Sequence, residues 1–243
     1  MLKKKKEKER RILEEFIKCY NGFPEGEIEG SEAPDFLVRT PTQVVGIELV
    51  EFVRGQSNRG SLIRQAESSR EELIKQARKE YARRNKTPLQ VSFFWCGESP
   101  LEKKSIPNLA KAIADIVDKY CSYGEIKLKE QLENTPLEGI LDSIVIRRLH
   151  GLQRNEWISP EAGWVGIEPQ ELQNIISSKQ KNMRRYLAKC NTVWLVIYAE
   201  GNHISSTVVL SDIEKIAKQH QFISHFQRVV FFDLWTRKSY NLK

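Results

Sequence analysis

Apolar residues recur along this 243-residue chain at two spacings, and each spacing predicts a different element. Residues 6–20, 61–84 and 169–189 carry apolar side chains every three or four positions, which is the pattern of a helix with one buried face. The runs "TVWLVIYAEG" (192–201) and "RVVFFDLW" (228–235) are mostly apolar and predict buried strands. Because helices and strands alternate, the pattern predicts an α/β sheet covered by helices.

Weaker patterns fill the rest of the chain. Turn-forming glycines and prolines follow the first helix, at about 21–34. The remaining expected elements are a strand at 89–97, a short helix at 107–124, strands with loops within 139–167 and a short helix near 211–219.

The same pattern bears on domain organisation. The chain has no linker long enough to require two domains, so we expect a single domain over 1–243. Within it, residues 1–10 are expected to form a basic helix start that frays, and residues 100–165 an insertion.

Residues 33–52, "APDFLVRTPTQVVGIELVEF", hold two apolar segments around the polar stretch "RTPTQ" and predict an antiparallel hairpin. If the chain turns at Pro41-Thr42, Val38 lies opposite Val45. The same register places Asp35 opposite Glu48, with Cβ atoms about 5 Å apart. A bulge of one residue would break this register, so the inference depends on an even loop.

Two carboxylates at this distance have a definite chemical consequence. If the site is dry, two negative charges repel strongly, so one acid must hold a proton or a cation must lie between them. An oxygen-rich pair suits Mg²⁺ or Mn²⁺, which keep several waters and accept phosphate oxygens. The alternative is an exposed hairpin end, where arginines such as Arg39 balance the acids.

One lysine interrupts the apolar stripe of the helix at 169–189. Lys179 lies three residues after Ile176 and four before Met183, so helical spacing places it on the core-facing side. Such a lysine either extends its stem outward to solvent or meets a buried anion. Lys75, in the earlier helix, lies off its apolar stripe and is a weaker candidate for the same task.

The stretch from Pro34-Asp35 to Glu48-Leu49-Val50 resembles the PD-(D/E)xK nuclease superfamily, over about residues 10–200. This resemblance implies a restriction-endonuclease-like fold, with a mixed central β-sheet flanked by helices on both faces. Within the superfamily, the sequence is similar to a poorly characterised bacterial branch. The lysine of the family motif would fall at Val50, but in some members it has moved to the following helix, where Lys179 would take its place.

The resemblance also implies roles for individual residues. Asp35 and Glu48 would be metal ligands together with the Leu49 carbonyl, the metal being Mg²⁺ or Mn²⁺, and Lys179 would complete the catalytic set. Further candidates are the additional acids Glu14, Glu15 and Glu51, with Gln180 as a contact to a phosphate. Apart from the resemblance, the stretch "IRRLHGLQRNEW" carries Arg147 and Arg148, which either contact nucleic acid or belong to a solvated hairpin.

Charge favours a polyanionic partner. The net charge is +7 and the pI about 9.2, and residues 1–18 carry eight Lys or Arg against four Glu. That segment is either a solvated helix start or an arm that contacts phosphates. The four cysteines form no CxxC pair, which argues against a zinc ribbon and a disulfide framework. With no apolar run of membrane length and no signal region, we expect a cytoplasmic protein without membrane contact.

These observations favour an Mg²⁺-dependent phosphodiesterase, an endonuclease acting on nucleic acid and first of all on DNA. Two alternatives stay open: a nuclease-fold module that binds nucleic acid without cutting it, which Val50 favours, and a protein-interaction scaffold. A homodimer is compatible with each of them.

Overall fold

The structure, a computed structural model, describes residues 2–57, 60–122, 124–160, 166–201 and 203–243. The chain forms two compact units, one from Met1–Arg54 with Gly163–Lys243, the other from Gly55–Ala162. We had expected one domain with an insertion at 100–165. The second unit is longer than that insertion, because it also includes helix α2 (Leu62–Arg84). This helix precedes residue 100 and packs with the elements that follow it.

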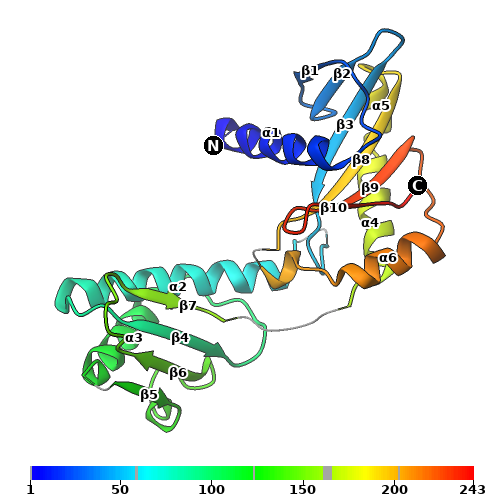
Figure 1. The fold of residues 1–243 in the computed structure, drawn as a ribbon. Helices are drawn as coiled ribbons and strands as arrows, with labels where there is room; N and C mark the ends of the chain where they lie inside the picture. Colours follow the sequence, from blue (N-terminus) through cyan, green and yellow to red (C-terminus); the bar gives the residue numbers. More distant parts are fainter. Residues whose placement is uncertain (1, 58–59, 123, 161–165, 202) are drawn as a thin grey trace. The chain divides into compact units, whose positions relative to one another are not determined.

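The first unit is built on a six-stranded sheet (Figure 1). Its strand order is β1-β2-β3-β8-β9-β10. The three central strands run parallel to one another and the outer pairs are antiparallel, so the sheet is mixed, as predicted. The strands are β1 (Glu27–Gly30), β2 (Phe36–Arg39), β3 (Val44–Glu51), β8 (Thr192–Ala199), β9 (Arg228–Asp233) and β10 (Lys238–Asn241).

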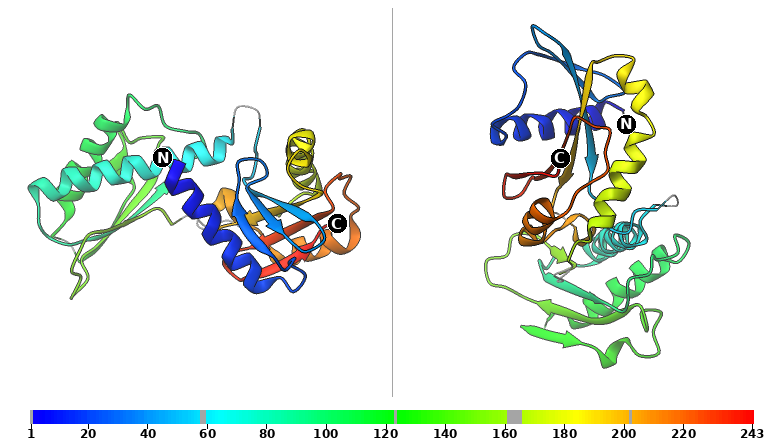
Figure 2. Two further views of the ribbon diagram at one scale, coloured as in Figure 1. Left: turned by 90° about the horizontal axis from the view of Figure 1, so that it is seen from above. Right: turned by 90° about the vertical axis from the view of Figure 1, so that its right-hand side faces the viewer.

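Helices cover both faces of this sheet (Figures 1 and 2). Helix α1 (Leu2–Cys19) packs its apolar stripe on one face, where Ile12 and Phe16 join a core with Ile47. The opposite face carries a second core, to which Leu172 and Ile176 contribute. The helices on that face are α4 (Pro169–Gln180), α5 (Met183–Leu187) and α6 (Leu210–Gln219), and the one-turn helix η2 (Ile204–Ser206) lies in the β8–α6 connection.

The second unit is a two-layer α/β module (Figure 1). Its four-stranded sheet has the order β5-β6-β4-β7, and two helices share a single core with it. Ser61 caps the first of these helices by accepting a hydrogen bond from the Arg64 N–H. The elements are α2 (Leu62–Arg84), β4 (Gln90–Trp95), α3 (Ile106–Tyr120), β5 (Glu125–Leu128), η1 (Glu130–Leu132), β6 (Leu141–Arg147) and β7 (Glu156–Ile158).

The structure corrects several predicted elements. The helix expected at 169–189 ends at Gln180 and resumes at Met183, because Asn182 donates to Lys179 O three residues back instead of continuing the α-helical pattern. Helical spacing from Met183 predicts Leu187 on the buried face of this helix, but Leu187 is exposed. Strands β1, β5 and β10 were not expected, and residues 161–165 of the predicted 139–167 stretch lie outside the described residues. None of the described helices could cross a membrane.

Candidate functional site

The β2–β3 hairpin has the predicted register. Thr40 N–H donates to Gln43 O across the turn, and Val38 pairs with Val45. The last regular pair is Phe36 with Ile47, so the next position along the same ladder sets Asp35 against Glu48. The two acids thus lie on neighbouring strands at the same level of the sheet.

Both acids lie on the face of the sheet that α4–α6 cover. Side chains alternate between faces along a strand, and Leu37 and Val50 belong to the core under these helices. Asp35 shares the face of Leu37, and Glu48 shares the face of Val50. Asp35 is 8% exposed and Glu48 is 6% exposed, so this is a buried pair rather than an exposed hairpin end. Arg39, the alternative partner, instead pairs with Glu29 at 2.9 Å.

Asp35 is held by the backbone of the neighbouring strand. Leu49 N–H donates to Asp35 Oδ2 at 2.8 Å, which favours the charged carboxylate. Burial and the nearby Glu48 outweigh this bond and raise the pKa of Asp35 to about 6. The Asp35 carboxyl therefore keeps its proton to a higher pH than an exposed aspartate does.

Lys179 reaches this pair from α4. Its Nζ lies 2.7 Å from Glu48 Oε1, and its stem passes beside the core residue Ile176, one turn earlier. The alternative, in which the ammonium extends to solvent, is not what the structure shows, since the lysine side chain is only 28% exposed. Tyr186 of α5 also faces Glu48, and burial together with that carboxylate raises the pKa of the tyrosine. The phenol therefore stays protonated and can donate a hydrogen bond.

Sequence reasoning missed one acid and one lysine of this cluster, both on α1. Glu9 is 7% exposed, and its charge contributes to the raised pKa of Asp35. Lys6 Nζ lies 3.2 Å from Glu9 Oε2 and 3.8 Å from Asp35 Oδ1. The signal was present in the sequence, because Glu9 precedes Ile12 and Leu13 by three and four residues and so lies on the apolar stripe.

The other candidate acids lie elsewhere. Glu14 is exposed and pairs with Arg10, while Glu15 pairs with Lys18. The structure therefore brings Glu9 of α1, rather than Glu14 or Glu15, to the Asp35–Glu48 pair. Glu51 lies at the end of β3, where Lys8 contacts it at 3.4 Å.

The residues expected to contact nucleic acid are divided between the two units. The Gln180 side chain accepts from His225 N–H at 2.7 Å, so it ties α4 to the loop before β9. Arg147 and Arg148 belong to the second unit, where Arg147 pairs with Glu125. Lys75 also lies there, exposed and paired with Glu72.

The residues present fit a hard divalent cation. Phe52 N–H bonds to Tyr198 O and Asn191 N–H bonds to Val44 O, so even-numbered residues of β3 turn their peptide groups toward β8. Leu49 is odd-numbered, and its N–H and carbonyl both point to the β2 edge, beside Asp35. Two carboxylates and a carbonyl are oxygen donors of the type that Mg²⁺ prefers, and an added cation would relieve the repulsion that raises the pKa of Asp35.

Two carboxylates are a sparse ligand set. Within the described ranges, no three His, Cys, Asp or Glu side chains form a metal-binding group. Mg²⁺ commonly binds through one or two carboxylates while keeping several waters, so the Asp35–Glu48 pair is compatible with that ion and less suited to Zn²⁺.

Comparison with known proteins adds no family to this picture. The chain matches no protein-family model, no curated protein and no solved structure. Interpretation of the site therefore depends on its geometry and chemistry.

Proposed function

We propose that this protein is a divalent-metal-dependent nuclease that hydrolyses phosphodiester bonds in nucleic acid, with DNA as the first substrate to test. The observation that carries the proposal is the convergence of three side chains on one face of the sheet. Asp35 and Glu48 come from neighbouring strands, and Lys179 reaches Glu48 at 2.7 Å from a helix more than a hundred residues later.

The fold of the first unit supports the same proposal. Its mixed sheet is flanked by α1 on one face and by α4–α6 on the other. We infer that this unit has the restriction-endonuclease-like fold, in which the motif acids occupy adjacent strands. The second unit enters the chain between β3 and α4, and is an insertion in this interpretation.

In the proposed reaction, Asp35, Glu48 and the Leu49 carbonyl hold the metal ion. When bound, such an ion polarises a phosphate and lowers the pKa of a water molecule. The protein contributes the fixed position of the ligands, because Leu49 N–H orients Asp35 and Lys179 orients Glu48. Burial of both acids reduces the water that would screen their charges.

Lys179 has the second role. Its ammonium lies beside Glu48 and can donate to a phosphate oxygen as negative charge develops there. Tyr186, which stays protonated, is a further donor beside the same carboxylate. Val50, at the usual motif position of the lysine, packs partly buried against the core, so α4 supplies the cation that β3 does not.

The proposal is tested by plasmid nicking with Mg²⁺ or Mn²⁺. We expect the wild type to nick, and Asp35→Ala and Lys179→Met to lose the activity by orders of magnitude. The matched control is Lys181→Met, which makes the same chemical change at an exposed position two residues away. A wild type that leaves the plasmid intact, or equal activity in Lys179→Met and Lys181→Met, contradicts the proposal.

A module that binds nucleic acid without cutting it is the second candidate. The observation that favours it is the Lys179–Glu48 ion pair, which already engages one oxygen of a proposed metal ligand. The same assay separates the two functions, because a binding module retards the plasmid on a gel in a salt-dependent manner but does not nick it.

A further inference from the structure

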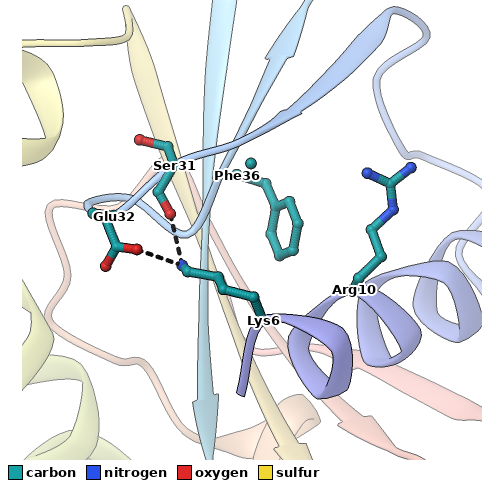
Figure 3. A pocket seen from close by; sticks show the side chains of 6 residues that line it. Lys6, Arg10, Ser31, Glu32 and Phe36 are labelled. Carbon is teal, nitrogen blue, oxygen red and sulfur yellow. Dashed lines mark hydrogen bonds and ion pairs between the residues drawn. The ribbon is translucent and has the colours of Figure 1, made fainter. Parts of the chain in front are cut away.

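A groove opens on the face of the sheet that α1 covers, between α1 and the segment that joins β1 to β2. It has a volume of about 380 Å³, in the range of small-ligand sites. Figure 3 shows Lys6 extending from α1 to Ser31 and Glu32, while Arg10 extends from the same helix on the other side of the Phe36 ring in this view. The lining residues are Lys6, Arg10, Gly30, Ser31, Glu32 and Phe36.

One residue connects this groove with the proposed active site. Lys6 lines the groove, donates to Ser31 O at 2.7 Å and lies 3.8 Å from Asp35 Oδ1. Ser31 N–H in turn donates to Asp35 O at 2.8 Å, so the groove wall and the acid belong to one hydrogen-bonded segment. Lys6 and Ser31 therefore connect the groove to Asp35 at the start of β2, although the Phe36 ring and the Asp35–Glu48 pair lie on opposite faces of the sheet.

The lining chemistry favours an anion with a flat apolar part. Lys6 and Arg10 contribute two cations, Glu32 one carboxylate and Phe36 an apolar wall. Arg10 donates to Glu14 through Nε, and a guanidinium has further N–H donors that suit phosphate oxygens. Glu32 already pairs with Lys6 at 3.6 Å, which leaves Arg10 as the cation best placed for a ligand.

We propose that this groove binds the nucleotide next to the cleaved phosphodiester, with Arg10 on its phosphate. The inference rests on the proposed nuclease function and adds the path of the substrate strand. A strand whose phosphate lies at Asp35 and Glu48 can pass around the Ser31–Asp35 segment to the α1 face, where the groove provides a recess with cations.

Gly30 offers a way to close the groove without straining the fold. It pairs with Phe36 across β1 and β2, so a side chain there would point to the same face as the Phe36 ring. A Cβ placed on Gly30 meets no described atom within 4 Å, and its φ is not in the left-handed region. Gly30→Tyr should therefore fill the groove with a ring. Gly124, also open and without positive φ, provides the matched control Gly124→Tyr in the second unit.

The experiment measures binding of a short fluorescein-labelled single-stranded DNA by anisotropy in EDTA, at several salt concentrations. We expect Arg10→Gln to weaken binding about tenfold and to lower the slope of log K against log salt by about one phosphate contact. Arg11→Gln removes the same charge from an exposed neighbouring position outside the groove lining, and should change binding less than about twofold. Gly30→Tyr should weaken binding at least as much as Arg10→Gln, and Gly124→Tyr should bind as the wild type does.

The outcomes separate the groove from the nuclease function. If Arg10→Gln and Arg11→Gln behave alike, or Gly30→Tyr binds normally, the groove proposal is overturned while wild-type nicking still supports the nuclease. If binding depends on the groove but the wild type does not nick with Mg²⁺ or Mn²⁺, the groove stands and the cleavage proposal fails. A wild type that binds no DNA even at low salt overturns both.

Discussion

At the scale of single residues, the surroundings of Asp35 raise the pKa of its carboxyl group. Its pKa rises from 3.8 to about 6, first through burial and then through Glu48. The folded protein therefore binds this proton more tightly than the unfolded chain does. It follows that the free energy of unfolding falls as the pH rises from about 4 to about 6, and the loss is complete above that range.

Asp35→Asn is expected to remove this loss of stability. The amide oxygen can still accept from Leu49 N–H, but it carries no charge. Without metal, the variant should be more stable than the wild type above pH 6, by up to about 3 kcal/mol for two pKa units, and equally stable below pH 3.8. Chemical denaturation in EDTA across this pH range measures the difference. A constant difference at all pH values would show that the Asp35 carboxyl titrates normally.

Lys179 and Glu48 should be coupled in stability as well as in function. Lys179→Met leaves a carboxylate that is 6% exposed without its ion-pair partner. Because the lysine itself is partly exposed and solvent screens the pair, we expect a loss of about 1–2 kcal/mol. Adding Glu48→Gln to that variant should recover most of the loss, so a double-mutant cycle with an interaction energy near zero would contradict the ion pair.

At the scale of elements, the hairpin depends on one glycine. A Cβ at Gly46 would lie 2.6 Å from Pro34 Cγ and 2.7 Å from Cys190 Sγ. The Pro34 ring and Cys190, in the connection between α5 and β8, can therefore pack on β3 only because residue 46 has no side chain. Pro34 directly precedes Asp35 and so helps to fix the position of that acid.

We expect Gly46→Ala to destabilise the protein by about 1–3 kcal/mol, the usual cost of overpacking a tight core. It should also reduce nicking, because a shift of Pro34 moves Asp35. Adding Cys190→Ala should recover part of the stability by removing one of the two contacts. Gly30→Ala is the control, since its Cβ meets open space. Thermal melting of the wild type and the three variants would contradict the prediction if Gly46→Ala and Gly30→Ala behaved alike.

Elements were predictable from sequence where the information is local. The even loop at Pro41-Thr42 sets the Asp35–Glu48 register, and the gap in an apolar stripe identified Lys179. Strand β1 is short and mostly exposed, so it carries no alternating apolar pattern. The break after Gln180 depends on a single turn at Asn182, and the role of Glu9 depends on where α1 docks, which no local pattern states.

At the scale of the whole molecule, each unit has its own core. Ile113 and Val91 belong to the core of the second unit, whereas Leu195 belongs to the core of the first. Sequence patterns predicted most of the longer helices and strands of both units but not the boundary, because the boundary depends on which distant elements pack together.

A cavity in one core should therefore destabilise one unit only. We expect Ile113→Ala to cost about 2–5 kcal/mol, as for other fully buried aliphatic residues, and to loosen the second unit. Hydrogen exchange followed by mass spectrometry should show faster exchange in β4 and β6 and unchanged protection in β3 and β8. Faster exchange in both sheets would mean that the two units unfold together.

The position of the second unit in the chain also affects the order in which the two units can fold during translation. Glu48 and Lys179 are 131 residues apart, so at a synthesis rate of about 5–20 residues per second the lysine follows the acid by about 7 to 26 s. Within that interval the whole second unit is synthesised and can fold. Strand β3 cannot yet pair with β8, its parallel neighbour, because β8 has not been synthesised. The centre that we propose therefore cannot assemble until most of the polypeptide has been translated, and a chain that terminates before Lys179 would lack one of its three side chains.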